Sequence, residues 1–226
     1  MKKSICLAIS FLFMSASALT AQKRIVMESS ADEFVTLWDN TTAKYSNYET
    51  KDEEDKGRKF ANTSSADLYI FKAPKEKATG YGVVILPGGS YRTVGFSTML
   101  AEWLRDNGVT AAVMKYRLPN YGHSEASFED GAGAIKYFRD NADRLNLDRS
   151  KIGICGSSAG GHLAAWVAAA ARGDQRPDFA ILIYGAMIRS VFWAGSDATR
   201  RLVGNDITAE KVKAMDVTEM VDETHP

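Results

Sequence analysis

Apolar residues along the chain form short runs typical of buried strands. Most of these runs are continuous, rich in Val, Ile and Ala, and bounded by Gly, Pro or polar residues, as in parallel strands covered on both faces. The first is shorter and alternates. We therefore predict strands at residues 67–71, 81–86, 109–116, 152–155 and 179–184.

Between these runs, apolar residues recur at helical spacing. The pattern predicts helices over 96–107, 126–146 and 159–171. Strands that alternate with helices at such intervals indicate βαβ units, so we predict an α/β fold with a mostly parallel sheet and helices on both faces. Residues 186–220 contain shorter helical pieces such as 209–215, which we expect to form a cap over the site.

The first residues have the layout of a secretory signal peptide. Lys2 and Lys3 precede an apolar run over 5–14, and small residues follow with candidate cleavage points after Ala18 or Ala21. The apolar run is far shorter than the ~20 residues that a bilayer span needs. We predict that residues 1–21 are a signal peptide and that the protein is exported, to the periplasm or outside the cell.

Residues 22–65 are polar and include a charge run at 51–59. Such composition is typical of solvated chain, so we predict a polar leader over 22–65 that precedes an α/β domain over 66–226.

Composition narrows the function classes. The chain has 226 residues, of which 45% are hydrophobic and 25% charged, which suits one globular α/β domain. Its formal net charge is zero and it has no block of Lys and Arg, so neither nucleic acid nor an anionic membrane surface is indicated as a partner. Cys6 lies in the signal peptide, and we expect Cys155 to be a packed thiol. We expect no metal and no cofactor.

The most informative motif is G-x-S-x-G, formed by Gly156, Ser158 and Gly160. It follows the strand at 152–155 and opens the helix at 159–171, which is the context of a nucleophile elbow. There the serine backbone is strained, and glycines two residues away avoid collisions. Ser157 does not fit, because Cys155 stands two residues before it. The alternative is an ordinary glycine-rich strand-to-helix turn.

Four motifs in order give the chain a resemblance to the α/β-hydrolase superfamily. More narrowly, it is similar to secreted bacterial esterases that include acetyl xylan esterases and other carbohydrate esterases. The motifs are Leu-Pro-Gly-Gly-Ser-Tyr at 86–91, Tyr-Arg-Leu-Pro at 116–119, Gly-Ser-Ser-Ala-Gly-Gly-His-Leu at 156–163 and Phe-Ala-Ile-Leu-Ile-Tyr at 179–184.

The resemblance implies the site residues. Ser158 would be the nucleophile, and the backbone N–H groups of Gly89, Ser90 and Ala159 would form the oxyanion hole. Relatives have a third glycine where this chain has Ser90, and the alternative reading of this loop is a plain strand-ending turn. Tyr91 and His123 are candidates for the substrate pocket.

In such a fold the catalytic Asp or Glu and the His come from later strands. The resemblance implies that the sequence stops before them, with roughly 50–70 residues absent, given about 30 for each strand-plus-helix unit. We therefore expect the triad Asp and His to be missing from this chain. His162 is expected to pack or cap, and His225 could form an unorthodox triad with Asp216 or Asp222.

The resemblance also places Arg117 and Asp130 as a structural pair that ties the 117–130 loop to the sheet.

The sequence predicts a serine carboxylester hydrolase that deacetylates plant polysaccharide or oligosaccharide. Two alternatives remain: a truncated product that is inactive or serves as a binding module, and, less favoured, a serine peptidase of the same superfamily. The acyl group and the oligomeric state are not encoded in any motif.

Overall fold

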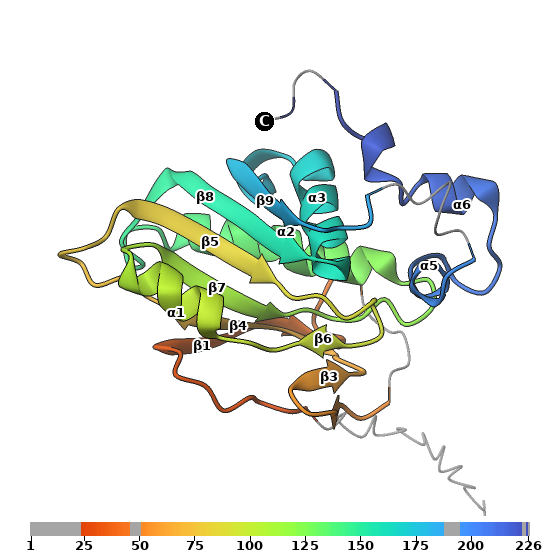
Figure 1. Cartoon of the computed structure of the whole chain (residues 1–226), viewed down its shortest axis with the longest axis horizontal. Helices are drawn as coiled ribbons and strands as arrows, with labels where there is room; N and C mark the ends of the chain where they lie inside the picture. The colour runs from red at the N-terminus through yellow and green to blue at the C-terminus, as the bar shows by residue number, and fades with distance from the viewer. Residues whose placement is uncertain (1–23, 46–50, 188–194, 223–224, 226) are drawn as a thin grey trace, which may run out of the picture.

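The computed structural model describes residues 24–45, 51–187, 195–222 and 225 (Figure 1). The predicted signal peptide at 1–21 lies outside the described residues. The main sheet has six strands in the order β1-β4-β7-β5-β8-β9. In chain order these strands are β1 (Glu33–Asp39), β4 (Ser65–Phe71), β5 (Gly80–Leu86), β7 (Thr110–Lys115), β8 (Leu147–Ser157) and β9 (Phe179–Ile183).

Four neighbouring strands of the sheet are parallel. β7 pairs with β5, β5 with β8 and β8 with β9, whereas β1 and β7 pair with β4 in the antiparallel direction. A second, small sheet contains β2 (Glu54–Asp55), β3 (Lys59–Ala61) and β6 (Val94–Gly95). The predicted apolar runs all lie in strands of the main sheet. β8 starts earlier than predicted, because Leu147 already pairs with Gly80 of β5.

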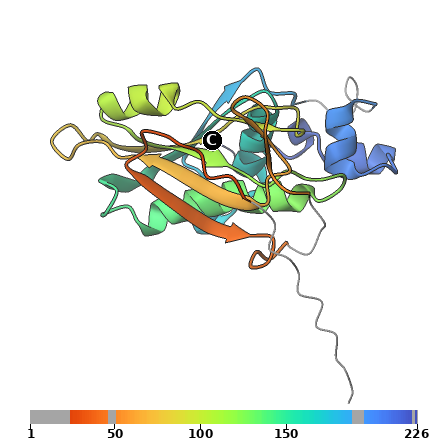
Figure 2. The ribbon, with the colours of Figure 1, turned by 90° about the horizontal axis from the view of Figure 1, so that it is seen from below.

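Helices cover both faces of the sheet, and each face takes alternate strand residues. α2 (Ser124–Asp140) and α3 (Ala159–Ala170) pack on the face that carries Val84 and Ile154. α1 (Met99–Asp106) packs on the opposite face with Val83 and Cys155. Figure 2 shows α1 and α2 on opposite sides of the sheet. Burial raises the pKa of the Cys155 thiol, as befits a packed side chain.

Helix α2 is shorter than the predicted segment 126–146. It ends at Asp140, and the chain then turns through Asn146, whose φ is 57°, to enter β8. A short 3₁₀ helix, η1 (Gly173–Gln175), links α3 to β9.

The segment from 22 to 65 is not the solvated leader that we expected. Its described part supplies β1 of the main sheet together with β2 and β3, and it contributes buried residues such as Met27 and Phe60. The charge run misled the prediction because one of its charged side chains, Glu53, is buried and paired inside the protein. A boundary at residue 65 therefore does not separate a leader from the domain.

Glu53 belongs to a buried cluster of charges around Lys115, which is fully buried on β7. Its Nζ lies 2.8 Å from Glu53 Oε2 and 2.9 Å from Asp67 Oδ2. It also donates to the carbonyl of Ile25 at 2.8 Å, and Arg24 pairs with Asp67 at 2.8 Å. Buried charges are tolerated when they are paired and hydrogen-bonded. This cluster holds the chain around residues 24–27 and 53 against the sheet.

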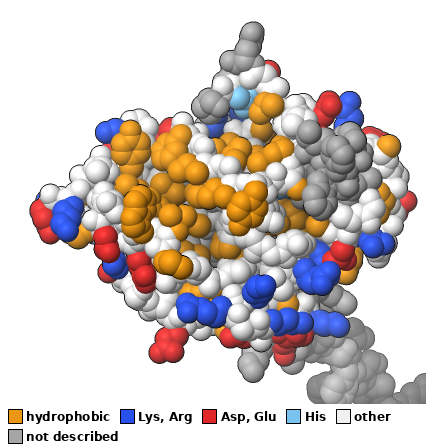
Figure 3. Space-filling view, in the orientation of Figure 1, with side chains coloured by type: hydrophobic (Ala, Val, Ile, Leu, Met, Phe, Trp, Pro, Cys, Tyr) orange, Lys and Arg blue, Asp and Glu red, His pale blue; other side chains and the backbone are white. Residues whose placement is uncertain are grey.

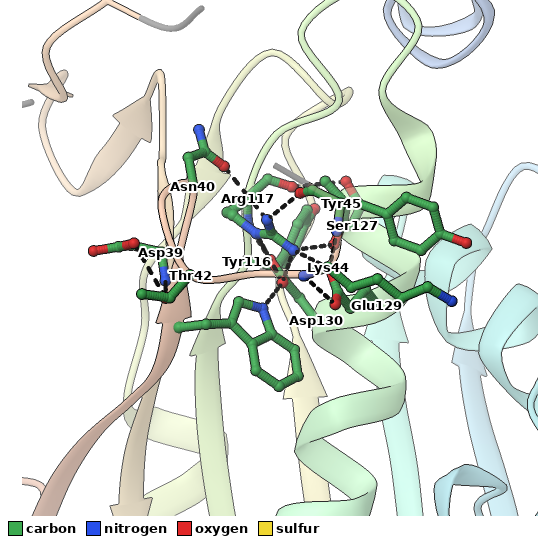
Figure 4. Close-up of polar contacts among 12 residues, drawn as sticks. Asp39, Asn40, Thr42, Lys44, Tyr45, Tyr116, Arg117, Ser127, Glu129 and Asp130 are labelled. Atoms are coloured by element: carbon green, nitrogen blue, oxygen red, sulfur yellow. Dashed lines mark hydrogen bonds and ion pairs between the residues drawn. The ribbon is translucent and has the colours of Figure 1, made fainter. Parts of the chain in front are cut away.

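A second buried cluster surrounds Arg117 (Figure 4). Its Nη2 lies 2.6 Å from Asp130 Oδ1, and its Nη1 donates to the carbonyl of Tyr45 at 2.7 Å. Trp38 of β1 donates to the same Asp130 oxygen at 2.6 Å, and Glu129 pairs with Arg117 at 2.9 Å. Burial raises the pKa of Asp130, and the Arg117 charge opposes that rise. The structural pairing of Arg117 with Asp130 is confirmed, and it extends to β1.

Short helices follow β9: α5 (Asp197–Val203), α6 (Ala209–Lys213) and the 3₁₀ helix η2 (Val217–Glu219). α5 and α6 lie toward the carboxyl ends of β5 and β8 (Figure 1), whereas η2 packs on α3. We call residues 195–222 the cap segment. Their position agrees with the predicted cap, although residues 188–194 lie outside the description.

Strand β9 is more exposed than a buried strand should be. It is the last strand in the sheet order, and Ile181 and Leu182 are 44% and 45% exposed. Figure 3 shows hydrophobic side chains gathered over the middle of this face of the molecule. Met99 and Trp103 of α1 are also exposed apolar residues. No described helix has the length and apolar character of a membrane span.

The Arg117 cluster yields a stability prediction. Asp130→Asn should lower the free energy of unfolding by about 3 kcal/mol, because it removes the fully buried carboxylate charge that pairs with the buried Arg117 guanidinium. Asp140→Asn, on the same helix, breaks an exposed pair with Lys136 and should cost less than about 1 kcal/mol. Urea unfolding followed by circular dichroism measures both. Equal losses in the two variants would contradict the prediction.

Candidate active site

Ser158 stands where β8 ends and α3 begins. Its φ of 53° and ψ of −119° are strained values for a residue with a side chain, and they cost on the order of 1–3 kcal/mol. Its N–H donates to the carbonyl of Ile183 and its carbonyl accepts from the N–H of His162, both at 3.0 Å. The sharp, strained turn is the backbone geometry that the sequence predicts for an elbow.

The glycines around Ser158 permit close contact between backbones. A β-carbon on Gly160 would lie 2.0 Å from the carbonyl oxygen of Leu86, and one on Gly156 would lie 2.1 Å from that of Gly160. Real β-carbons do not approach so closely, so glycine is required at both positions. The start of α3 thereby packs directly against the end of β5.

The loop after β5, residues 87–93, lies directly beside Ser158. A β-carbon on Gly88 would be 3.1 Å from Ser158 Cβ. Gly89 has a φ of 150° and faces the Thr93 carbonyl, whereas Ser90 and Tyr91 both have φ near 55°. Among the described residues, no hydrogen-bond acceptor is found for the N–H groups of Gly89 and Ser90. Two of the predicted oxyanion donors are therefore carried by a loop in contact with the elbow.

Tyr91 is fully buried, so its side chain lies beneath the loop and not in an open pocket. Its hydroxyl forms a 2.7 Å hydrogen bond with His162 Nδ1. His123 is exposed at the start of α2, next to Gly122, whose N–H donates to the carbonyl of Arg201 on α5. Of the two pocket candidates, only His123 is presented to solvent.

No histidine reaches the Ser158 hydroxyl in the described structure. His162 uses both ring nitrogens elsewhere, since Nε2 bonds the carbonyl of Met215 at 2.7 Å. His225 bonds Asp222 and, through Nε2, the carbonyl of Ala169 at 2.8 Å. Ala169 lies eleven residues beyond Ser158 along α3, about 16 Å at 1.5 Å per residue. This geometry removes the unorthodox triad built on His225.

Asp216 does not join that triad either. It is buried, and its carboxylate accepts hydrogen bonds from the N–H and hydroxyl of Thr218 at the start of η2. Its place is that of a cap on a short helix.

An apolar groove lies between α3 and β9 and has a volume of about 420 Å³. It is lined by Ala165, Leu182, Val221 and His225 among others, toward the far end of α3 from Ser158. Ser158 does not line this groove, so the groove is not a substrate pocket for that serine. In the part of the chain that is described, no group of three or more His, Cys, Asp or Glu side chains could hold a metal ion.

The arrangement of strand, strained serine and glycine loop agrees with the comparisons with known proteins. A family model described as BD-FAE matches residues 67–222, well over half of the chain. The chain belongs to the BD-FAE family.

Two curated relatives are similar over shorter stretches. An acetylxylan esterase from Xylanibacter ruminicola is 32% identical over 112 residues, which cover 48% of this chain and 23% of that protein. Probable carboxylesterase 6 from Arabidopsis thaliana is 35% identical over 102 residues, 42% of this chain and 30% of that protein. The chain thus spans less than a third of the length of either relative.

Among solved structures, an acetyl ester-xyloside bifunctional hydrolase from Caldicellulosiruptor lactoaceticus matches with a TM-score of 0.64 and 27% identity. The match covers 73% of this chain and 65% of that protein. The fold is therefore the α/β-hydrolase fold, and the fold class predicted from the sequence is confirmed.

Sequence reasoning missed the contacts between the loop at 87–93 and the cap segment. Arg92 bonds Asp197 of α5 at 2.9 Å, and Tyr91 reaches Met215 through His162. These partners lie more than fifty positions apart, and no periodicity or motif connects them. Only their place in the fold brings them together.

Proposed function

We propose that this protein is a serine carboxylester hydrolase and that Ser158 is its nucleophile. The observation that carries the proposal is the strained Ser158 backbone in contact with the glycine loop at 87–90. Such a turn lifts a serine hydroxyl above the end of a sheet, and the adjacent loop offers backbone N–H groups to a developing negative charge. Membership of the BD-FAE family and the esterases among the relatives support this reaction class.

The proposed chemistry follows from these groups. Ser158 Oγ forms a bond to the ester carbonyl carbon, and the carbonyl oxygen becomes negative. The N–H groups of Gly89, Ser90 and Ala159 stabilise this oxygen, each contributing about 3–4 kcal/mol to the transition state. The alcohol then leaves with a proton, and water hydrolyses the acyl-serine.

The reaction also needs a base for the serine proton, and no described histidine occupies that place. Without a base, Ser158 keeps the pKa of an alcohol and is a poor nucleophile at neutral pH. This geometry also supports the competing proposal, a non-catalytic protein that binds esters without cleaving them. The two are separated by whether any Ser158-dependent turnover exists.

We propose acetyl esters of plant polysaccharide or oligosaccharide as the substrate class. The support is the resemblance to acetylxylan esterases and the predicted export, which would place the protein with large extracellular substrates. The solved neighbour is itself described as acting on an acetyl ester and a xyloside. The peptidase alternative gains no support from these relatives.

The nucleophile assignment predicts where a covalent probe attaches. After long incubation with a fluorophosphonate, mass spectrometry should find the label on Ser158, and Ser158→Ala should abolish it. Ser157→Ala is the matched control, because Ser157 is the adjacent last residue of β8, and it should keep most of the label. Labelling of Ser158→Ala, or none in the unaltered chain, would contradict the proposal.

Because no described histidine reaches Ser158, we predict chemical rescue by an added base. Hydrolysis of p-nitrophenyl acetate by the 226-residue chain should be far below the common enzyme value of about 10 s⁻¹. The oxyanion donors alone should leave a residual rate on the order of 10³–10⁴ over water. Added imidazole should raise the part of the rate that Ser158→Ala lacks, since it can accept the serine proton. Fast turnover without imidazole would show that a base is already in place.

The substrate proposal predicts a preference for short acyl groups. With Ser158→Ala as background, acetate release from acetylated xylan should exceed cleavage of p-nitrophenyl dodecanoate under the same imidazole concentration. A preference for the long chain would favour a lipase-like specificity. The assay measures acetate by enzymatic coupling and p-nitrophenolate by absorbance.

A further inference from the structure

The cap segment and the loop at 87–93 meet at one imidazole ring. His162 lies one helical turn after Ser158 on α3, fully buried. Its Nδ1 is 2.7 Å from the Tyr91 hydroxyl, and its Nε2 is 2.7 Å from the Met215 carbonyl oxygen. The ring thus bridges two segments that the chain separates by more than a hundred residues.

The hydrogen-bond partners of His162 define which of its ring nitrogens carries the hydrogen. A carbonyl oxygen only accepts, so Nε2 carries a hydrogen and donates it to Met215. In a neutral ring Nδ1 is then an acceptor, and it takes the hydrogen of the Tyr91 hydroxyl. Met215 lies two residues beyond the last helical residue of α6, where helix ends leave carbonyls without a helical partner.

The other end of the bridge is a strained loop. Ser90 and Tyr91 have successive positive φ values of 55° and 54°, which residues with side chains hold only when the surroundings determine them. Tyr91 is anchored by its ring in the core and by its hydroxyl on His162. The hydrogen bond of the Tyr91 hydroxyl therefore helps to hold the strained backbone at Ser90 in place.

A second contact joins the same two segments. Arg92 Nη2 lies 2.9 Å from Asp197 Oδ2, and Arg201 Nε lies 3.0 Å from the same oxygen. These hydrogen bonds, first from Arg201 and then from Arg92, lower the pKa of Asp197. Arg92 is largely exposed, so this contact is weaker than the buried bridge.

We propose that His162 is a positioning residue that holds the oxyanion loop to the cap segment. In this arrangement a movement of the cap at Met215 changes the position of the Gly89 and Ser90 N–H groups beside Ser158. The role in catalysis rests on the proposed esterase function, whereas the mechanical link does not. The fold thereby couples the segment over the site to the groups that would stabilise the transition state.

Hydrogen exchange of the full chain, followed by mass spectrometry, tests the link without any activity. Tyr91→Phe removes one hydroxyl and should speed exchange about 5- to 10-fold in peptides covering 88–95, the loss expected for one hydrogen bond. It should also speed exchange in peptides covering 209–220, because the freed ring holds Met215 less firmly. Tyr137→Phe is the control, since the Tyr137 hydroxyl bonds Arg144 on the molecular surface, and it should change neither region.

Two substitutions of His162 separate the bridge from simple packing. His162→Asn places an oxygen near the position of Nδ1 and should keep the 88–95 region protected while 209–220 exchanges faster. His162→Gln places a nitrogen near the position of Nε2 and should show the reverse. A Tyr91→Phe effect confined to 88–95, or equal effects of the Asn and Gln variants on both regions, would overturn the proposal.

A different experiment would contradict the proposed esterase function. Absence of phosphonate label on Ser158 would remove the esterase assignment and leave the exchange pattern unchanged. If the exchange pattern holds, an active preparation of Tyr91→Phe should show a lower kcat with little change in KM, because oxyanion donors act in the transition state.

Discussion

The site depends on three stretches of backbone approaching closer than any side chain would allow. The end of β5, the end of β8 and the first turn of α3 touch through Gly88, Gly156 and Gly160, where a β-carbon would fall 2.0–2.8 Å from a carbonyl oxygen. This contact forces the chain through Ser158 at a positive φ and brings the next loop against it. The strain at Ser158 and the need for glycine around it therefore have the same cause, which is this close backbone contact. The packing of the surrounding sheet offsets the energy of the strain.

The sheet in turn is held by charges buried inside it. Lys115 and Arg117, two residues apart at the end of β7, each bind carboxylates from the N-terminal half of the chain or from α2. Burying such pairs brings little net stability, but losing one partner is costly, so the clusters act mainly to fix which segments pair. Through Asp130 the Arg117 cluster also fixes Trp38, and with it β1, on the sheet.

The cap segment contributes to the site from the other side. It contacts the loop at 87–93 through the buried His162 ring and an exposed Arg92–Asp197 pair. The loop has two successive strained residues, Ser90 and Tyr91. A small displacement of the cap segment would therefore move the N–H groups of this loop relative to Ser158. His162 is close to Ser158 in the sequence and has the side chain of a base, but both of its ring nitrogens bind other groups. A suitable residue type near Ser158 is therefore not sufficient evidence of a catalytic role.

The sequence by itself determined five of the six strands of the main sheet, the alternation of these strands with helices, and the position of the strained turn at Ser158. Each rests on neighbours in the chain: apolar runs for strands, 3.6-residue spacing for helices, and two glycines around Ser158. The tertiary structure alone decided that β1 joins the sheet, that β9 is exposed, that Tyr91 is buried and that His162 bridges the loop to the cap. These features depend on contacts between residues far apart in sequence, such as Lys115 with Glu53 and His162 with Met215. A charged segment reads as solvated until its partners are known, because local composition does not reveal a distant counter-ion.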